Sequence, residues 1–179
     1  MRQLYRGGVL IACLVASLAL VGGAASAPSI PVNVSSNVAS FTSDVGCCVE
    51  STISDPFKIV VPRLGRLTAV ADLDVCGSDC DPDGETIFSI QFTAPSGGSF
   101  VLIGSVHSGN LGSLGGGGTW SVLATGPFAP TGRFSKITGS GTWSAAATIV
   151  GPHVEPIDGP PGADSTLALS LRGTLALRS

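Results

Sequence analysis

Apolar and polar residues alternate along most of the chain after residue 27, and this period of two predicts β-strands. The clearest run is Leu67–Val75, where apolar side chains hold the odd positions and Asp72 and Asp74 stand between them. A second run, Leu167–Leu177, repeats leucine on one parity and contains Gly173, which we interpret as the site of a β-bulge. Both runs predict strands with one face in a core and one in water.

Shorter alternating segments predict six further strands. They are Val32–Phe41, Phe57–Val61, Thr86–Phe92, Ser99–Ile103, Thr119–Ala124 and Thr142–Val150. Residues that favour turns separate these segments, and the run Gly115–Gly118 is expected to be a flexible tip. About eight strands joined in this way predict an all-β fold, either an antiparallel β-sandwich or a barrel.

One tetrapeptide occurs twice: Gly118-Thr119-Trp120-Ser121 is repeated as Gly141-Thr142-Trp143-Ser144. Two copies are too few for a repeat array, so we interpret them as equivalent positions on two strands. We expect both tryptophans in the core. The alternative is an exposed aromatic platform for a sugar or a peptide.

From about Glu50 to Gly173 the order of motifs resembles the P domain of proprotein convertases and bacterial secreted proteins. The motifs are Ser51-Thr52-Ile53, the stretch Phe88–Gly97, Gly126-Pro127-Phe128 and Gly141-Thr142-Trp143-Ser144. The resemblance implies a jelly-roll-like β-sandwich, and without a protease domain it implies little about activity. A cysteine-rich acidic loop replaces the histidine and Asp-Leu segment of that family.

The first 27 residues have the three parts of a secretory signal peptide. Arg2 and Arg6 give a positive start, Val9–Val21 is apolar, and Ala25-Ser26-Ala27 offers the small residues that a signal peptidase cleaves after. A membrane anchor needs about 20 apolar residues, and the glycines at 22 and 23 interrupt this run earlier. We therefore expect residues 1–27 to be a signal peptide and residues 28–179 to form one domain, secreted or otherwise periplasmic or extracellular.

The net charge of the exported part limits the classes of partner that it is expected to bind. The chain has nine Lys and Arg against twelve Asp and Glu, and two of the nine, Arg2 and Arg6, lie in the signal peptide. The remaining seven leave the exported part with a net charge of −5. A nucleic-acid or anionic-membrane partner requires clustered positive charge, so we expect no nucleic acid and no membrane contact after signal cleavage.

Four cysteines follow the signal peptide: Cys47, Cys48, Cys76 and Cys80. In an oxidising compartment an even number favours disulfides. A bridge between the adjacent Cys47 and Cys48 would be strained, so we expect bridges from this pair to Cys76 and Cys80. The alternative is a four-thiolate zinc site, which adjacent cysteines fit poorly.

The segment between Asp72 and Glu85 is rich in acids and contains Asp79, Asp81 and Asp83 in a D-x-D-x-D-G pattern. Three carboxylates at this spacing followed by glycine can converge on calcium, with Glu85 as a further ligand. Ile90 stands where an EF-hand requires glutamate, so an EF-hand is excluded. The alternative is a solvated acidic tip.

Catalytic signatures are scarce. After the signal peptide the histidines are His107 and His153, both in sequence rich in Gly, Ser or Pro, and the chain has no G-x-S-x-G or H-E-x-x-H motif. We expect no catalytic residues and no organic cofactor. The leading hypothesis is an exported, non-catalytic β-sandwich module with a structural or interaction role and a protein or glycan partner, for which calcium is a candidate stabilising ion. The alternative is a secreted hydrolase that uses a loop histidine.

Overall fold

The computed structural model describes residues 28–44, 48–53, 55–76, 85–107, 114–152 and 162–178. These residues form nine β-strands and one 3-10 turn, so the all-β expectation is confirmed. The elements are β1 (Ser29–Asp44), β2 (Cys48–Ile53), β3 (Phe57–Val61), β4 (Gly65–Cys76), β5 (Glu85–Thr93), β6 (Ser99–His107), β7 (Gly115–Val122), η1 (Gly132–Phe134), β8 (Ile137–Pro152) and β9 (Gly162–Leu177). The expected signal peptide lies outside the described residues. Among the described residues no helix is long and apolar enough to cross a membrane.

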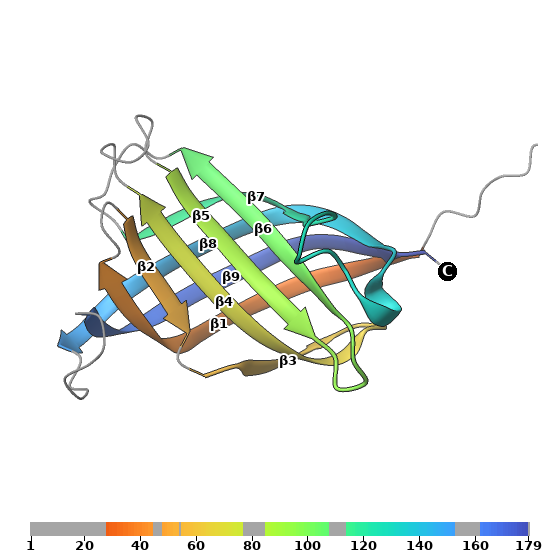
Figure 1. Ribbon diagram of the computed structural model, residues 1–179, viewed down its shortest axis with the longest axis horizontal. Helices are drawn as coiled ribbons and strands as arrows, with labels where there is room; N and C mark the ends of the chain where they lie inside the picture. The colour runs from red at the N-terminus through yellow and green to blue at the C-terminus, as the bar shows by residue number, and fades with distance from the viewer. Residues whose placement is uncertain are drawn as a thin grey trace, which may run out of the picture.

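The strands form one antiparallel sheet that closes on itself (Figure 1). The order is β2-β1-β9-β8-β7-β6-β5-β4-β3, and pairing of β2 with β4 completes an eight-stranded barrel. The short β3 pairs with β4 beyond the end of β2. The jelly-roll-like sandwich is therefore not confirmed. Side chains alternate in the same way in a sandwich and in a barrel. The pairings of strands that are not neighbours in sequence, β1 with β9 and β2 with β4, distinguish the two folds.

The barrel has two different ends (Figure 1). At one end, here called the turn end, lie the connections β3–β4, β5–β6 and β7–β8, together with the start of β1 and the end of β9. At the other end, the loop end, β1 connects to β2, β4 to β5, β6 to β7, and β8 to β9. Much of the chain in the loop-end connections falls outside the described residues.

Alternation fills the barrel interior with apolar side chains. On β4 the odd positions from Leu67 to Val75 are buried, and on β5 the even positions from Thr86 to Phe92 are buried. Three phenylalanines pack near the turn end: Phe92 lies 5.1 Å from Phe100, and Phe100 lies 5.0 Å from Phe134, measured between ring centroids. The buried face expected for Leu67–Val75 and the strand expected at Thr86–Phe92 are thus confirmed.

The connection between β7 and β8 covers the turn end. The backbone N–H of Thr131 donates to the Ser99 carbonyl oxygen at 2.8 Å, and its hydroxyl accepts from the Ser99 N–H at 3.0 Å. Arg133 donates to the Leu64 carbonyl oxygen at 2.6 Å and lies over the ring of Phe134, which is fully buried. These contacts hold Phe134 in the barrel as a plug.

The two copies of the repeated tetrapeptide pair with each other on β7 and β8. Gly118 lies opposite Trp143, Thr119 opposite Thr142, and Trp120 opposite Gly141. Each indole therefore extends over the glycine of the other copy. Both tryptophans are buried, as expected, with exposed fractions of 2% and 3%. Trp143 stacks on Phe88 at 5.1 Å, and Trp120 Nε1 donates to the Arg172 carbonyl oxygen at 3.2 Å.

Two expectations about glycine were wrong. Gly115–Gly118 is not a tip but the first half of β7, because its glycines leave room for Trp143 and for the backbone of β8. Gly173 is not a bulge but pairs in register with Val32 and Gly141, and it lies under the Trp120 ring. The irregularity in this region is instead between Ile149 and Gly151 on β8.

The close approach of Gly104 to Trp143 yields a stability prediction. A Cβ on Gly104 would lie 2.6 Å from the Thr119 carbonyl oxygen and within contact distance of the indole. Gly104→Ala should therefore lower the free energy of unfolding by about 1–3 kcal/mol, the usual cost of overpacking. The measurement is urea denaturation followed by tryptophan fluorescence. Gly151→Ala is the control, since a Cβ there meets nothing within 4 Å, and equal stability of the two variants would contradict the prediction.

Candidate site at the loop end of the barrel

Near the loop end, several of the buried side chains carry hydroxyl groups and are not apolar. Ser40 and Thr42 of β1 each lie 2.7 Å from Ser165 of β9, measured between hydroxyl oxygens. Thr42 also lies 2.7 Å from Ser51 of β2. All four residues are buried. Their hydroxyls satisfy one another across three strands, so the cluster joins the strands and offers no charged group for acid–base chemistry.

On the same wall a disulfide joins the strands that close the barrel. Cys48 of β2 is bonded to Cys76 of β4, and the two residues are direct cross-strand partners. This confirms one bridge between the two cysteine segments, and a disulfide is compatible with an extracellular location. Cys47 and Cys80 lie outside the described residues, so the second bridge stays a prediction.

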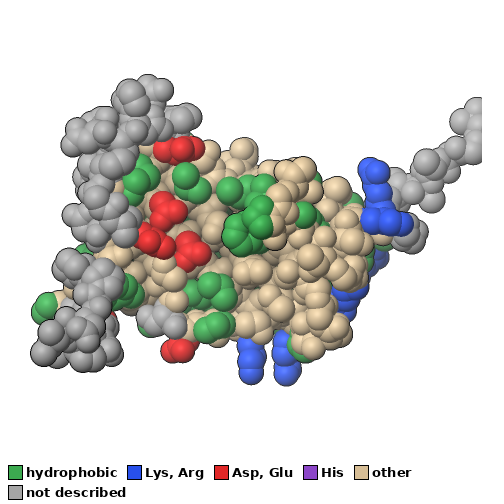
Figure 2. All heavy atoms as spheres, viewed as in Figure 1, with side chains coloured by type: hydrophobic (Ala, Val, Ile, Leu, Met, Phe, Trp, Pro, Cys, Tyr) green, Lys and Arg blue, Asp and Glu red, His purple; other side chains and the backbone are tan. Residues whose placement is uncertain are grey.

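The outer face of this β2–β4 seam carries three carboxylates: Glu50, Asp72 and Asp74 (Figure 2). Glu50 is the cross-strand partner of Asp74, and Thr52 is that of Asp72. Burial and then repulsion from Glu50 and Asp72 raise the pKa of Asp74 to about 6. Burial also raises the pKa of Asp72, against a hydrogen bond with Thr52 that lowers it. The seam is thus a place where like charges face each other.

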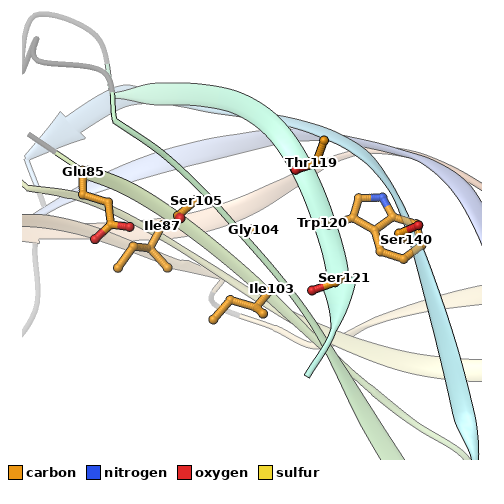
Figure 3. A pocket seen from close by; sticks show the side chains of 9 residues that line it. All are labelled: Glu85, Ile87, Ile103, Gly104, Ser105, Thr119, Trp120, Ser121 and Ser140. Atoms are coloured by element: carbon orange, nitrogen blue, oxygen red, sulfur yellow. The ribbon is translucent and has the colours of Figure 1, made fainter. Parts of the chain in front are cut away.

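Beside the seam, a groove of about 500 Å³ crosses the outside of β5, β6, β7 and β8 (Figure 3). Glu85 and Ser140 lie at opposite sides of it, and the isoleucines at 87 and 103 form its apolar part. The other lining residues are Gly104, Ser105, Thr119, Trp120 and Ser121. One carboxylate and several hydroxyls can hydrogen-bond a polar ligand. Among these lining residues there is neither a histidine nor a second carboxylate to complete an acid–base pair.

Of the residues expected to bind calcium, the structure describes only Glu85. Glu85 is the first residue of β5, while Asp79, Asp81 and Asp83 lie outside the described residues. Within the described residues no group of three His, Cys, Asp or Glu is arranged to hold a metal ion. The calcium site and the solvated tip therefore both stay open as predictions.

The side chains of the two candidate catalytic histidines are not among those that the structure describes. The backbone of His107 ends β6 and is paired in register with Glu85, and His153 lies outside the described residues. Sequence reasoning missed the three-carboxylate seam. Asp72 and Asp74 were recognised as the polar side of a strand, but β2 was not predicted, so their partner Glu50 could not be placed.

No family model, no curated protein and no solved structure matches this chain. The resemblance to a P domain stays a prediction, and the function has to be argued from the structure.

The raised pKa of Asp74 predicts a pH dependence of stability. An unfolded aspartate has a pKa of 3.8, whereas the folded value is about 6. The folded protein therefore retains a proton that the unfolded chain has lost, and stability falls as the pH rises between these two values. Since the site is partly solvated, Asp74→Asn should raise the free energy of unfolding at pH 7 by only about 1 kcal/mol. Urea denaturation at several pH values measures this.

The asparagine variant should also show a flatter pH profile between pH 4 and pH 6 than the wild type. Asp55→Asn is the control, because this exposed residue lies on the β2–β3 connection, away from the seam. Identical pH profiles for the wild type and Asp74→Asn would show that the seam does not hold the proton.

The disulfide predicts a large loss of stability on reduction. Replacing Cys48 and Cys76 together with alanine should lower the free energy of unfolding by about 2–4 kcal/mol, because the bridge closes a long loop in the unfolded chain. Non-reducing peptide mapping should recover the Cys48–Cys76 peptide pair from oxidised protein, and a second pair that joins Cys47 to Cys80. Free thiols at Cys47 and Cys80, or a mass that includes zinc, would exclude the second bridge.

Proposed function

We propose that this chain is an exported, non-catalytic β-barrel module that recognises a protein or a glycan through its outer surface. The observation that carries the proposal is the content of the barrel. Among the described residues, the buried polar or charged side chains are all hydroxyls: Ser40, Thr42, Ser43, Ser51, Thr86 and Ser165. An acid, base or metal-dependent reaction inside the barrel would need charged or ionisable groups, and none of the side chains described as buried carries one.

The packing of the interior supports the same proposal. Phe88, Trp120 and Trp143 occupy the middle of the barrel, and Phe134 fills the turn end. A barrel of eight strands is just wide enough for side chains to fill it or for one small ligand. Here two indoles and several phenylalanines take up that width, which favours a scaffold over a carrier of apolar ligands.

The outside of the barrel supplies the groups that a partner could recognise. The groove on β5–β8 combines Glu85 with hydroxyls and two isoleucines, which suits a polar ligand such as a glycan or an extended peptide. A closed barrel with a covalent bridge across its seam holds such a surface rigid, so little conformational entropy is lost when a partner binds.

A cavity-filling experiment tests whether the interior is the functional site. Indole or a fatty acid titrated into wild-type protein should give no saturable change in tryptophan fluorescence, since aromatic side chains fill the middle and the turn end of the described core. Trp143→Ala is the positive control: it removes a buried indole and should create an apolar cavity that binds free indole. Such a variant loses about 3–5 kcal/mol, so Leu169→Ala provides a milder cavity if it does not fold.

Two outcomes would refute the proposal. One is stoichiometric binding of an apolar ligand by the wild type, which would make the chain a carrier. The other is turnover of an ester, glycoside or peptide that is lost in His107→Ala or His153→Ala, which would make it a hydrolase.

A further inference from the structure

The charged side chains of this barrel are separated by sign. All seven Lys and Arg that follow the signal peptide lie in its turn-end half, and all seven are exposed. They are Lys58, Arg63, Arg66, Arg133, Lys136, Arg172 and Arg178. Toward the loop end lie five acids whose side chains the structure describes: Glu50, Asp72, Asp74, Glu85 and Asp164. Figure 2 shows this separation on one face of the molecule.

The turn end has no compensating acids in its connections. The β3–β4 turn, the β5–β6 turn and the β7–β8 connection contain no Asp or Glu, and neither does β9 after Asp164. The nearest exposed acid outside the loop-end half is Asp55, on the β2–β3 connection. The net charge of −5 therefore conceals a strongly positive end, and it is local charge that an anionic partner meets.

The turn end also carries exposed apolar side chains among its cations. Phe128, in the β7–β8 connection, is 58% exposed, and Val60, between Lys58 and Arg66 on the β3–β4 hairpin, is 74% exposed. Arginine and lysine beside exposed apolar residues are typical of surfaces that lie on anionic lipid, where the cations meet headgroups and the apolar groups enter the interface.

We propose that the turn end, defined by its seven cations with Phe128 and Val60, docks on an anionic lipid surface. The proposal goes beyond the module function proposed above, because it adds a lipid surface at the turn end to the protein or glycan partner of the outer surface. Net charge alone led us to expect no membrane contact, and the separation of charge reverses this expectation for one end of the barrel.

The arrangement of the cations favours a surface over a linear polyanion. They come from β3, the β3–β4 turn, the start of β4, η1 and the residues before β8, and the last third of β9 with the residue that follows it. They therefore surround the end of the barrel and do not line a groove. The groove on β5–β8 and a second one across β1, β7, β8 and β9 have no Lys or Arg among their lining residues. A polyanion bound along a groove would need cations there.

Sedimentation with lipid vesicles tests the proposal on the exported, oxidised protein. Vesicles of phosphatidylcholine with phosphatidylglycerol should retain the protein at low salt and release it at high salt, whereas pure phosphatidylcholine should retain little. Each cation removed should lower the partition coefficient roughly fivefold, so Lys58→Gln/Arg66→Gln should lower it roughly 25-fold. Both side chains are exposed, on β3 and β4, so the substitutions are expected to leave the fold intact.

Two matched controls test whether binding depends on where the substituted residues lie, and not on the net charge or on a loss of fold. Ala39→Glu/Thr148→Glu makes the same change in net charge at exposed positions nearer the loop end and should change the partition coefficient less than about threefold. Phe128→Ser should lower partitioning roughly tenfold, whereas Val150→Ser, which changes an even more exposed apolar side chain near the loop end, should have no effect. Cooperative thermal unfolding of each variant verifies its fold.

The proposal is overturned if the wild type is not retained by anionic vesicles, or if both double variants lose binding equally. It is also overturned if soluble polyphosphate binds as tightly as vesicles and Phe128→Ser changes neither, because the partner is then a polymer. None of these results affects the module function, which the cavity experiment tests separately.

Discussion

The packing of two indoles against glycine is the constraint on which the rest of this barrel depends. Trp120 and Trp143 lie on adjacent strands and both point inward, so the barrel must provide space for two of the largest side chains at nearly the same level. Glycines at 104, 116 and 118 provide it around Trp143, and glycines at 141 and 173 provide it around Trp120. Because a Cβ at any of these positions would contact a ring or the backbone, the glycines and tryptophans form one unit. Trp143 Nε1 has no hydrogen-bond partner among the described residues, so tight packing offsets an unpaired polar atom.

The polar side chains described as buried are all hydroxyls, and the charged side chains of the β2–β4 seam and of the turn end lie on the outside, where their arrangement has structural consequences. Glu50 faces Asp74 across the seam that closes the barrel, and like charges directly opposite each other weaken a strand pair. The Cys48–Cys76 bridge lies two residues away on both strands. It holds the seam together against this repulsion from outside, while the hydroxyls of Thr42, Ser51 and Ser165 join β1, β2 and β9 from inside. Closure of the barrel thus depends on covalent and hydrogen-bonded links at the place where its charges oppose it.

Sequence reasoning found the elements that obey a simple period and missed those whose form depends on a distant partner. Phe57–Val61 was predicted with the bounds that β3 has, and the buried parity of Leu67–Val75 was right. The strand Gly115–Val122 was half missed because four glycines favour a turn locally, and only the opposing Trp143 gives them a reason to be extended. The strand β2 was missed because it is short and because one of its inward side chains, Ser51, is polar and is paired with Thr42. Barrel and sandwich share one local pattern, so closure could not be read from it.

The candidate sites, too, divide into those that a local pattern predicts and those that depend on a distant strand. A bridge between the two cysteine segments could be predicted, because adjacent cysteines do not bridge to each other easily. Which cysteines pair, and the acidic seam, depend on the register of β2 on β4. The separation of charge is still harder to predict from the sequence. Lys58, Arg133 and Arg172 are far apart along the chain, and they come to one end only because antiparallel strands return each connection to the same two ends of the barrel. Composition reports a net charge, but the field that a partner experiences near the surface is set by charges within about 10 Å. An acidic protein can therefore present a basic end, and the topology of the barrel determines where that end lies.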